Sequence, residues 1–194
     1  LLAYEVDFMQ NSSLMLDEIL NAKVDYLIGS VHFIQEKSKK ENDLWGFDNP
    51  EFIGKYKEKN IDDIWIDYFS AIKQMAKSNL FNVVGHLDLI KVFKYLPKKD
   101  IRIIAGEALK EIKKSDMVLE INSAGLRKPI AEAYPSKELL SLAYELDIPI
   151  TFSSDAHSVD QIGFRYYDAV SFAKDIGYSK CTFFRKKDQI VVDF

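Results

Sequence analysis

Cysteine and histidine are both scarce in this sequence of 194 residues, and neither sign of charge is in large excess. The one cysteine, Cys181, cannot form an internal disulfide, which indicates a reducing compartment such as the cytoplasm. No apolar run approaches the roughly 20 residues of a membrane-spanning helix, so no membrane partner is expected. The net charge of −4 offers no basic surface for a nucleic acid, although a local pocket for a small phosphate stays open.

Glycine is scarce as well, with eight residues, and no glycine-rich phosphate fingerprint follows any apolar run. Hydrophobic residues at 47% and charged residues at 29% are ordinary for a globular protein, and the length suits one domain over 1–194. The opening stretch LLAYEVDF has no methionine, polar tail or cap and is typical of a strand already under way. We therefore expect a missing segment before Leu1.

Short apolar runs alternate with helical stretches along the chain. The runs typical of strands are 1–8, 24–33, 80–86, 116–122 and 148–157, with a hairpin over 180–194. The helical stretches are 14–22, 61–79, 100–115, 136–147 and one ending near Gly177. Asp100 and Ser136 are the predicted N-caps. Residues 34–60 are expected to form a long surface loop. This alternation predicts parallel strands covered by helices.

A (β/α) barrel is the layout that we favour, because polar side chains follow several strands and a barrel gathers its chemistry at the carboxyl ends of its strands. A doubly wound sheet is the alternative, but its site would lie at one switch point. In the long loop Phe47, Phe52 and Tyr56 fit a lid, and they fit ordinary loop packing equally well.

All three histidines lie where an apolar run stops: His32, His86 and His157. One such histidine would usually be a satisfied core residue. Three together, with Glu5 and Asp155 placed alike, predict a site for Zn²⁺, Mn²⁺ or Fe²⁺, since imidazole and carboxylate are the ligands of these ions. Burying such groups with no compensating charge would cost several kcal/mol.

Side chains two apart in a strand point to the same face, so Asp155 and His157 could serve neighbouring ions if the strand continued through them. The same geometry holds for Glu5 and Asp7, but Asp7 is interpreted as a solvated strand end. Ser153, beside the site, is interpreted as a supporting donor.

Arg127 lies just past a strand end in NSAGLRKP. An exposed loop arginine is the commoner case, yet a guanidinium also matches phosphate oxygens with paired hydrogen bonds. Lys128 and Arg165 are weaker candidates for the same task. Glu120 and Asn122 could bind an ammonium or hydroxyl of a substrate, or could cap the next loop.

Four motifs, in this order and spacing, resemble the histidinol phosphatase branch of the PHP (polymerase and histidinol phosphatase) family. They are YLIGSVHF, VVGHLDLIK, LEINSAGLRKPIAEAYPS and SSDAHSVDQIG. The resemblance implies a distorted seven-stranded (β/α)7 TIM-like barrel, here without its first strand or strands. It also implies a centre of three divalent ions. Glu5 would bridge two of them, with the other ligands being His32 and His86 at one ion, Asp155 at a second and His157 at a third.

The resemblance further implies hydrolysis of L-histidinol phosphate to L-histidinol and phosphate in histidine biosynthesis. Glu5, Asp155 and Arg127 would be the catalytic residues. The substrate would be bound by Arg127, Glu120, Asn122, Tyr134 and Arg165. The partner would be this small metabolite, and a homodimer is left open.

The family's opening His-x-His motif is absent here and is expected upstream of Leu1, so the hydrolysis and the three ions are expected of the full-length parent. The alternatives are a PHP phosphodiesterase or exonuclease, and a non-catalytic metal-binding remnant.

Overall fold

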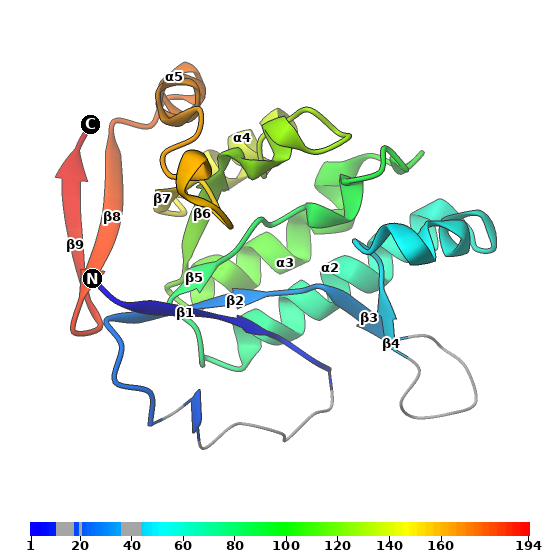
Figure 1. The fold of residues 1–194 in the computed structure, drawn as a ribbon, viewed down its shortest axis with the longest axis horizontal. Coiled ribbons are helices and arrows are strands. Elements are labelled where there is room, and N and C mark those ends of the chain that lie inside the picture. Colours follow the sequence, from blue (N-terminus) through cyan, green and yellow to red (C-terminus); the bar gives the residue numbers. More distant parts are fainter. Residues whose placement is uncertain (11–17, 20, 36–43) are drawn as a thin grey trace.

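Five parallel strands form the main sheet, in the order β1-β2-β5-β6-β7 (Figure 1). The computed structural model describes residues 1–10, 18–19, 21–35 and 44–194. The strands are β1 (Ala3–Asp7), β2 (Tyr26–Ser30), β5 (Val83–Val84), β6 (Val118–Asn122) and β7 (Ile150–Ser153). Strand order follows chain order with no reversal, unlike a doubly wound sheet. The predicted parallel α/β class is confirmed, whereas β1 and β7 do not pair within the described residues, so closure into a barrel is not seen.

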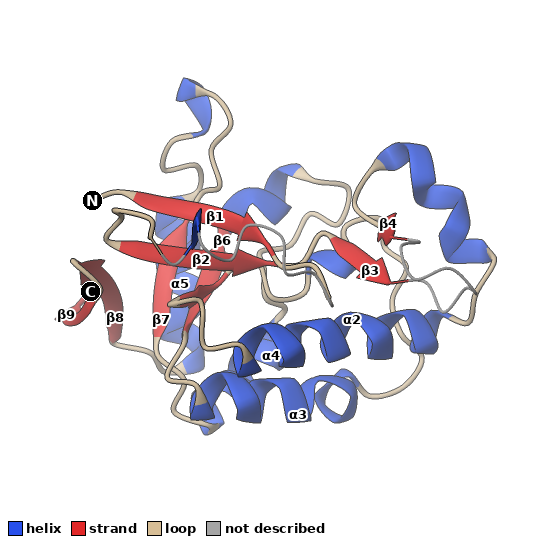
Figure 2. Ribbon diagram, turned by 90° about the horizontal axis from the view of Figure 1, so that it is seen from below, coloured by secondary structure: helices blue, strands red, loops and turns tan. Residues whose placement is uncertain are grey.

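Four α-helices pack against one another in chain order, α2 on α3, α3 on α4 and α4 on α5. They are α2 (Ile61–Lys77), α3 (Ile101–Lys114), α4 (Lys137–Glu145) and α5 (Tyr166–Ile176). Figure 2 shows α2 and α3 side by side along the sheet. Both predicted caps are confirmed, because Asp100 accepts from the Arg102 amide and Ser136 from the Leu139 amide. Gly177, with φ of 125°, ends α5 as predicted.

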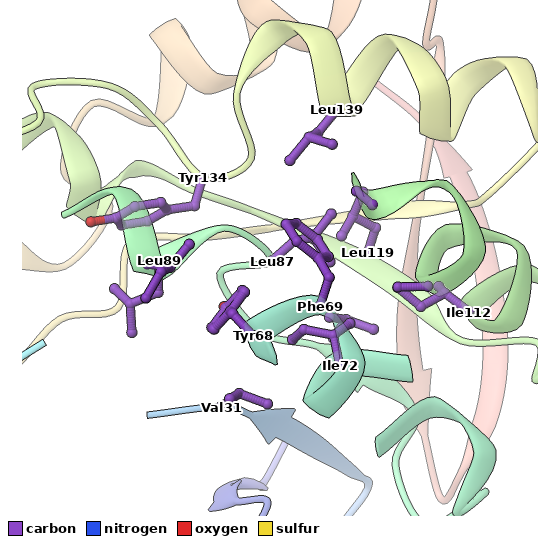
Figure 3. Packing of buried hydrophobic residues seen from close by; sticks show 14 of the residues in the cluster. Val31, Tyr68, Phe69, Ile72, Leu87, Leu89, Ile112, Leu119, Tyr134 and Leu139 are labelled. Carbon is purple, nitrogen blue, oxygen red and sulfur yellow. The ribbon is translucent and has the colours of Figure 1, made fainter. Parts of the chain in front are cut away.

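The buried face of α2 supplies much of the core. Ile64, Trp65, Tyr68, Phe69 and Ile72 all have 2% or less of their surface exposed, which confirms the helical spacing. Figure 3 shows Tyr68, Phe69 and Ile72 in the same packed cluster as side chains of the loop after β5, of β6 and of α4. The helices therefore cover the sheet and leave the carboxyl ends of its strands for other groups.

The expected loop over 34–60 is wrong where the structure describes it. A strand β3 (Phe33–Gln35) pairs antiparallel with β4 (Leu44–Gly46), and a 3₁₀ helix η1 (Pro50–Lys57) follows. Phe47 is fully buried, with its ring centroid 5.3 Å from that of Tyr68, and Tyr56 is buried too. Two of the three proposed lid aromatics are thus core residues, because α2 supplies a partner surface that local sequence does not reveal. Residues 36–43, and most of the expected helix over 14–22, lie outside the described residues.

The predicted C-terminal hairpin is confirmed as β8 (Lys180–Arg185) and β9 (Asp188–Asp193). Its turn is tied to the sheet by Asp25, whose carboxylate accepts from the amides of Leu2 and Lys186, both at 2.8 Å. Three further 3₁₀ turns follow strands: η2 (Leu89–Lys91), η3 (Ser123–Arg127) and η4 (Val159–Gln161). Among the described residues, no helix combines the length and the apolar character that crossing a membrane requires.

Gly29 in β2 lets α2 approach the sheet. A Cβ added there would lie 2.6 Å from Cγ of Phe81 and 2.7 Å from Sδ of Met75. We predict that Gly29→Ala lowers the free energy of unfolding by about 1–3 kcal/mol, because it overpacks the core. The matched change Gly106→Ala in α3, where an added Cβ meets nothing within 4 Å, should raise it by about 0.5–1 kcal/mol. Urea unfolding measures both, and equal midpoints for the two variants would contradict the packing argument.

Candidate metal centre

The parallel register brings the carboxyl ends of the strands to one edge of the sheet. Asp7 of β1 lies opposite Ser30 of β2, and Asn122 of β6 lies opposite Ser153 of β7. The polar residues that follow β2, β5 and β7 therefore leave the sheet at the same edge as those ending β1 and β6. This convergence is the geometric basis of the site.

Glu5, His32 and His86 form the centre of this edge. Each offers a ligand atom, and the three atoms lie within 4.8 Å of one another. His86 Nε2 is 3.0 Å from Oε1 of Glu5, and the two imidazole ring centroids are 4.9 Å apart. His86 is buried, while the other two are partly open to solvent. Residues that are 81 positions apart in the chain thus meet at one point.

Opposite charges stabilise each other in this cluster. Burial opposes the charge on Glu5, but contacts from His86 and Ser30 outweigh it and lower the pKa of the carboxyl to about 2. Burial also disfavours the imidazolium of His86, yet Glu5 and further carboxylates raise its pKa to about 9. The carboxylates therefore stabilise positive charge in this cluster.

A divalent cation suits this donor set. Two imidazoles and one carboxylate are a ligand combination typical of Zn²⁺ sites that keep positions open for water or substrate. The buried Nδ1 of His86 has no hydrogen-bond partner among the described residues, which leaves one ring nitrogen available to a ligand. Glu5, His32 and His86 are the residues that would hold the ion.

Two residues orient the ligands, and the sequence analysis missed their roles. Asp7 is the exposed end of β1, as interpreted from the sequence, but its Oδ1 also lies 2.5 Å from Nδ1 of His32. Ser30 Oγ donates to Oε1 of Glu5 at 2.6 Å. Gly85 makes room for this contact, since an added Cβ would lie 2.3 Å from that hydroxyl. The usable signal was strand periodicity: Asp7 follows Glu5 by two, and Ser30 precedes His32 by two.

Glu120 and Asn122 point inward and serve the protein itself. Oε2 of buried Glu120 accepts from the His86 amide at 2.8 Å and from Nδ2 of Asn122 at 2.9 Å. Burial raises the pKa of Glu120, and the charge of His86 partly offsets this. Oδ1 of Asn122 accepts from the Ala124 amide, which is the capping role that the sequence left open. These two side chains tie β6 to the loop after β5.

Asp155 and His157 lie beyond the end of β7. The strand does not continue through them, so the alternation that would point both side chains to the same face does not apply. The strand ends at Ser153, and Asp155 has a left-handed φ of 46°. Asp155 is mostly buried and its carboxylate lies 3.5 Å from Nδ2 of Asn122. The His157 side chain is 80% exposed, with Nδ1 3.0 Å from the Asp155 carbonyl oxygen. Asp155 therefore borders the cluster, and His157 faces solvent beside it.

Arg127 donates to the backbone of this loop. Its NH1 group donates to the Ser154 carbonyl at 2.8 Å, its NH2 group donates to the Asp155 carbonyl, and the guanidinium lies over the ring of Phe164. Part of its five-donor capacity is thus used to hold the loop that carries Asp155.

The two remaining substrate-binding candidates differ in burial. Arg165 is exposed and paired with Asp168. Tyr134 is buried, with its ring centroid 6.3 Å from that of His86. Tyr134 therefore lines the inner side of the cluster, whereas Arg165 is held by a surface ion pair.

A parallel α/β sheet with imidazoles and carboxylates gathered at its carboxyl edge defines a candidate metalloprotein. A family model described as the PHP domain matches residues 1–124. A Deinococcus radiodurans protein named "Probable histidinol-phosphatase" is 38% identical over 189 residues, covering 97% of this chain and 69% of that protein. The chain belongs to the PHP family.

Other relatives agree with this placement. The Bacillus subtilis protein named "Histidinol-phosphatase" is 29% identical over 177 residues, 84% of this chain and 63% of that protein. A crystal structure of histidinol phosphate phosphatase from Lactococcus lactis, complexed with Zn, L-histidinol and phosphate, has the same fold, with a TM-score of 0.62 at 23% identity. The match covers 90% of this chain and 65% of that one. The chain thus spans roughly two thirds of the length of these relatives.

Asp7 should tune the affinity of the site for a metal. We predict that Asp7→Asn weakens binding of Zn²⁺ by about 10–100-fold, because it removes the carboxylate that orients His32 and raises its basicity. His86→Ala, which removes a ligand, should lower the bound Zn²⁺ per chain while leaving the fold largely intact. Asp175→Asn, at an exposed position of α5, is the matched control and should change nothing. Calorimetric titration and elemental analysis measure these effects, and wild-type affinity in Asp7→Asn would remove Asp7 from the site.

Proposed function

We propose that the protein is a metal-dependent phosphomonoesterase that hydrolyses L-histidinol phosphate to L-histidinol and phosphate, a step of histidine biosynthesis. The observation that carries this proposal is the Glu5–His32–His86 cluster, placed at the carboxyl edge of a PHP-family sheet. The names of the relatives at 38% and 29% identity support the choice of substrate. The substrate is a small phosphorylated metabolite, so neither nucleic acid nor membrane is a partner.

The finer features of the enzyme belong to the same proposal. The sheet is part of a distorted seven-stranded (β/α)7 TIM-like barrel, and 1–194 belongs to a single PHP domain. The centre holds three ions of Zn, Mn or Fe, with Asp155 and His157 as ligands beside Glu5, His32 and His86. The enzyme works in the cytoplasm, and a homodimer is compatible with its small substrate.

The residues of the site have different roles in the proposed reaction. Divalent ions held by these ligands would supply an activated water and neutralise phosphate charge. Glu5 and Asp155 would hold the ions in place through their carboxylate oxygens. Arg127 keeps unused N–H donors after bonding the 154–155 carbonyls, and these donors stabilise charge on the phosphate oxygens. Tyr134 and Arg165 complete the surface that binds the substrate. Glu120 and Asn122 support this surface through their hydrogen bonds within the protein.

Phosphate release from L-histidinol phosphate tests the proposal directly. The purified protein should release phosphate, lose that activity to a chelator and regain it when Zn²⁺, Mn²⁺ or Fe²⁺ is added back. Glu5→Gln should lower kcat by at least about 100-fold, since it removes a charged ligand from the centre. Cleavage of a phosphodiester or a single-stranded oligonucleotide, with no release from histidinol phosphate, would favour a PHP phosphoesterase of another specificity. Metal binding with no hydrolysis of any ester would indicate a non-catalytic metal-binding protein.

Arg127 should matter chiefly for phosphate binding. We predict that Arg127→Ala raises KM for histidinol phosphate by about tenfold to a hundredfold, because a charge-assisted hydrogen bond contributes about 1.5–3 kcal/mol. Inhibition by inorganic phosphate should weaken in parallel. Lys110→Ala, at an exposed position of α3, is the control and should leave both values near wild type. A lower melting temperature with unchanged kinetics would restrict Arg127 to holding the Asp155 loop.

A further inference from the structure

Lys91 is a buried lysine with every donor in use. Only 1% of its surface is exposed, and it lies at the end of the 3₁₀ turn η2. Its Nζ lies 2.8 Å from the Ala133 carbonyl, 3.1 Å from Oδ2 of Asp88 and 3.2 Å from Oε2 of Glu132. An ammonium has three N–H donors, so these three contacts satisfy it completely. The Nζ also lies 5.3 Å from the ring centroid of Tyr134.

Asp88 extends the same network to the start of α4. The residue is fully buried, and its Oδ2 accepts from the Ser136 amide at 2.9 Å as well as from Lys91. A buried ion pair is a costly way to stabilise a fold, because well-packed apolar side chains of similar volume often stabilise as much or more. Fixing one arrangement of neighbouring segments is the better-supported use of such a pair. The segments that meet here identify what is fixed.

Residues 131–136 are held from two sides by this arrangement. On one side the ammonium of Lys91 binds the Ala133 carbonyl and Asp88 binds the Ser136 amide. On the other side Tyr134 and Asn122 exchange two backbone hydrogen bonds, of 2.7 and 2.9 Å. The segment thus bridges the loop after β5, which carries His86, and the end of β6.

The same segment presses on η3, which carries Arg127. A Cβ added at Gly125 would lie 1.9 Å from the Glu132 carbonyl oxygen, so the two backbones touch at this glycine. Arg127 follows two residues later and donates to the carbonyls of the loop that carries Asp155. A shift of residues 131–136 would therefore move η3 and, through it, the guanidinium of Arg127.

We propose that the buried Lys91–Asp88 pair positions Arg127 by holding residues 131–136 against η3. The pair lies outside the Glu5–His32–His86 cluster, so both residues are positioning residues. This role rests on the proposed function of Arg127 in phosphate binding. The link from the pair to η3 is a property of the fold, however, and can be measured without any substrate.

The double variant Lys91→Met/Asp88→Asn tests the proposal without leaving an unpaired buried charge. Backbone amides of 123–136 in the metal-loaded protein should exchange hydrogen at least about tenfold faster, because the segment opens locally. KM for histidinol phosphate should rise about tenfold with kcat changed less than about threefold, as expected for lost ground-state binding. Zn²⁺ stoichiometry should stay at the wild-type value. The control Lys73→Met/Glu107→Gln removes an exposed ion pair between α2 and α3. It should leave the hydrogen exchange, the kinetic values and the Zn²⁺ stoichiometry unchanged.

A double-mutant cycle with Arg127→Ala separates positioning from general stability. If the pair acts through Arg127, its loss should add no further increase in KM once Arg127 is absent. Three results would overturn the proposal: additive increases in KM, a wild-type rate of hydrogen exchange over 123–136 in the double variant, and loss of Zn²⁺ from that variant. If the unmodified protein releases no phosphate, the proposed function fails while the exchange measurement still decides the link. If the double variant does not fold, Glu132→Ala is used instead, because it removes only the exposed partner of Lys91. Unchanged hydrogen exchange over 123–136 in Glu132→Ala would also overturn the proposal.

Discussion

The contact between Glu5 and His86 is the interaction on which the arrangement of the site depends. It joins the first strand of the sheet to the loop after β5, across β2, and it places a carboxylate beside a buried imidazole. The same His86 is held from the other side through its amide by Glu120 of β6. One histidine thus connects β1, the loop after β5, and β6. Because parallel strands bring their carboxyl ends to one edge, this short network organises side chains from the whole width of the sheet.

Local patterns in the sequence predicted the parts of the fold that local chemistry determines. The helix over 61–77 followed from apolar spacing, and the caps Asp100 and Ser136 followed from residue type. The aromatic segment after β3 could not be predicted, because the burial of Phe47 depends on Tyr68 in a helix that comes later in the chain. β5 is only two residues long because pairing with its neighbours, rather than its apolar sequence, sets its limits.

The same distinction applies to the site. Histidine and acid at strand ends predicted which residues meet, and Glu5, His32 and His86 do meet. The roles of Asp7 and Ser30 depend on the register between β1 and β2, which no single stretch of sequence contains. The arrangement of Asp155 and His157 depends on a left-handed residue just after β7, where alternation along a strand no longer applies.

Charge around the cluster affects how well a phosphate can bind there. Glu5, Asp7, Glu120 and Asp155 surround two imidazoles, and Arg127 spends part of its donor capacity on backbone carbonyls. A phosphate dianion brought to this edge would meet a surplus of carboxylates, and at close range in a partly buried site such repulsion is strong. Divalent cations held by these ligands would reverse the sign of the local field. In the proposed enzyme, a phosphate would therefore bind better to the metal-loaded site. The buried positive charge of Lys91 cannot take over this task, because its three donors are already committed to Asp88, Glu132 and Ala133.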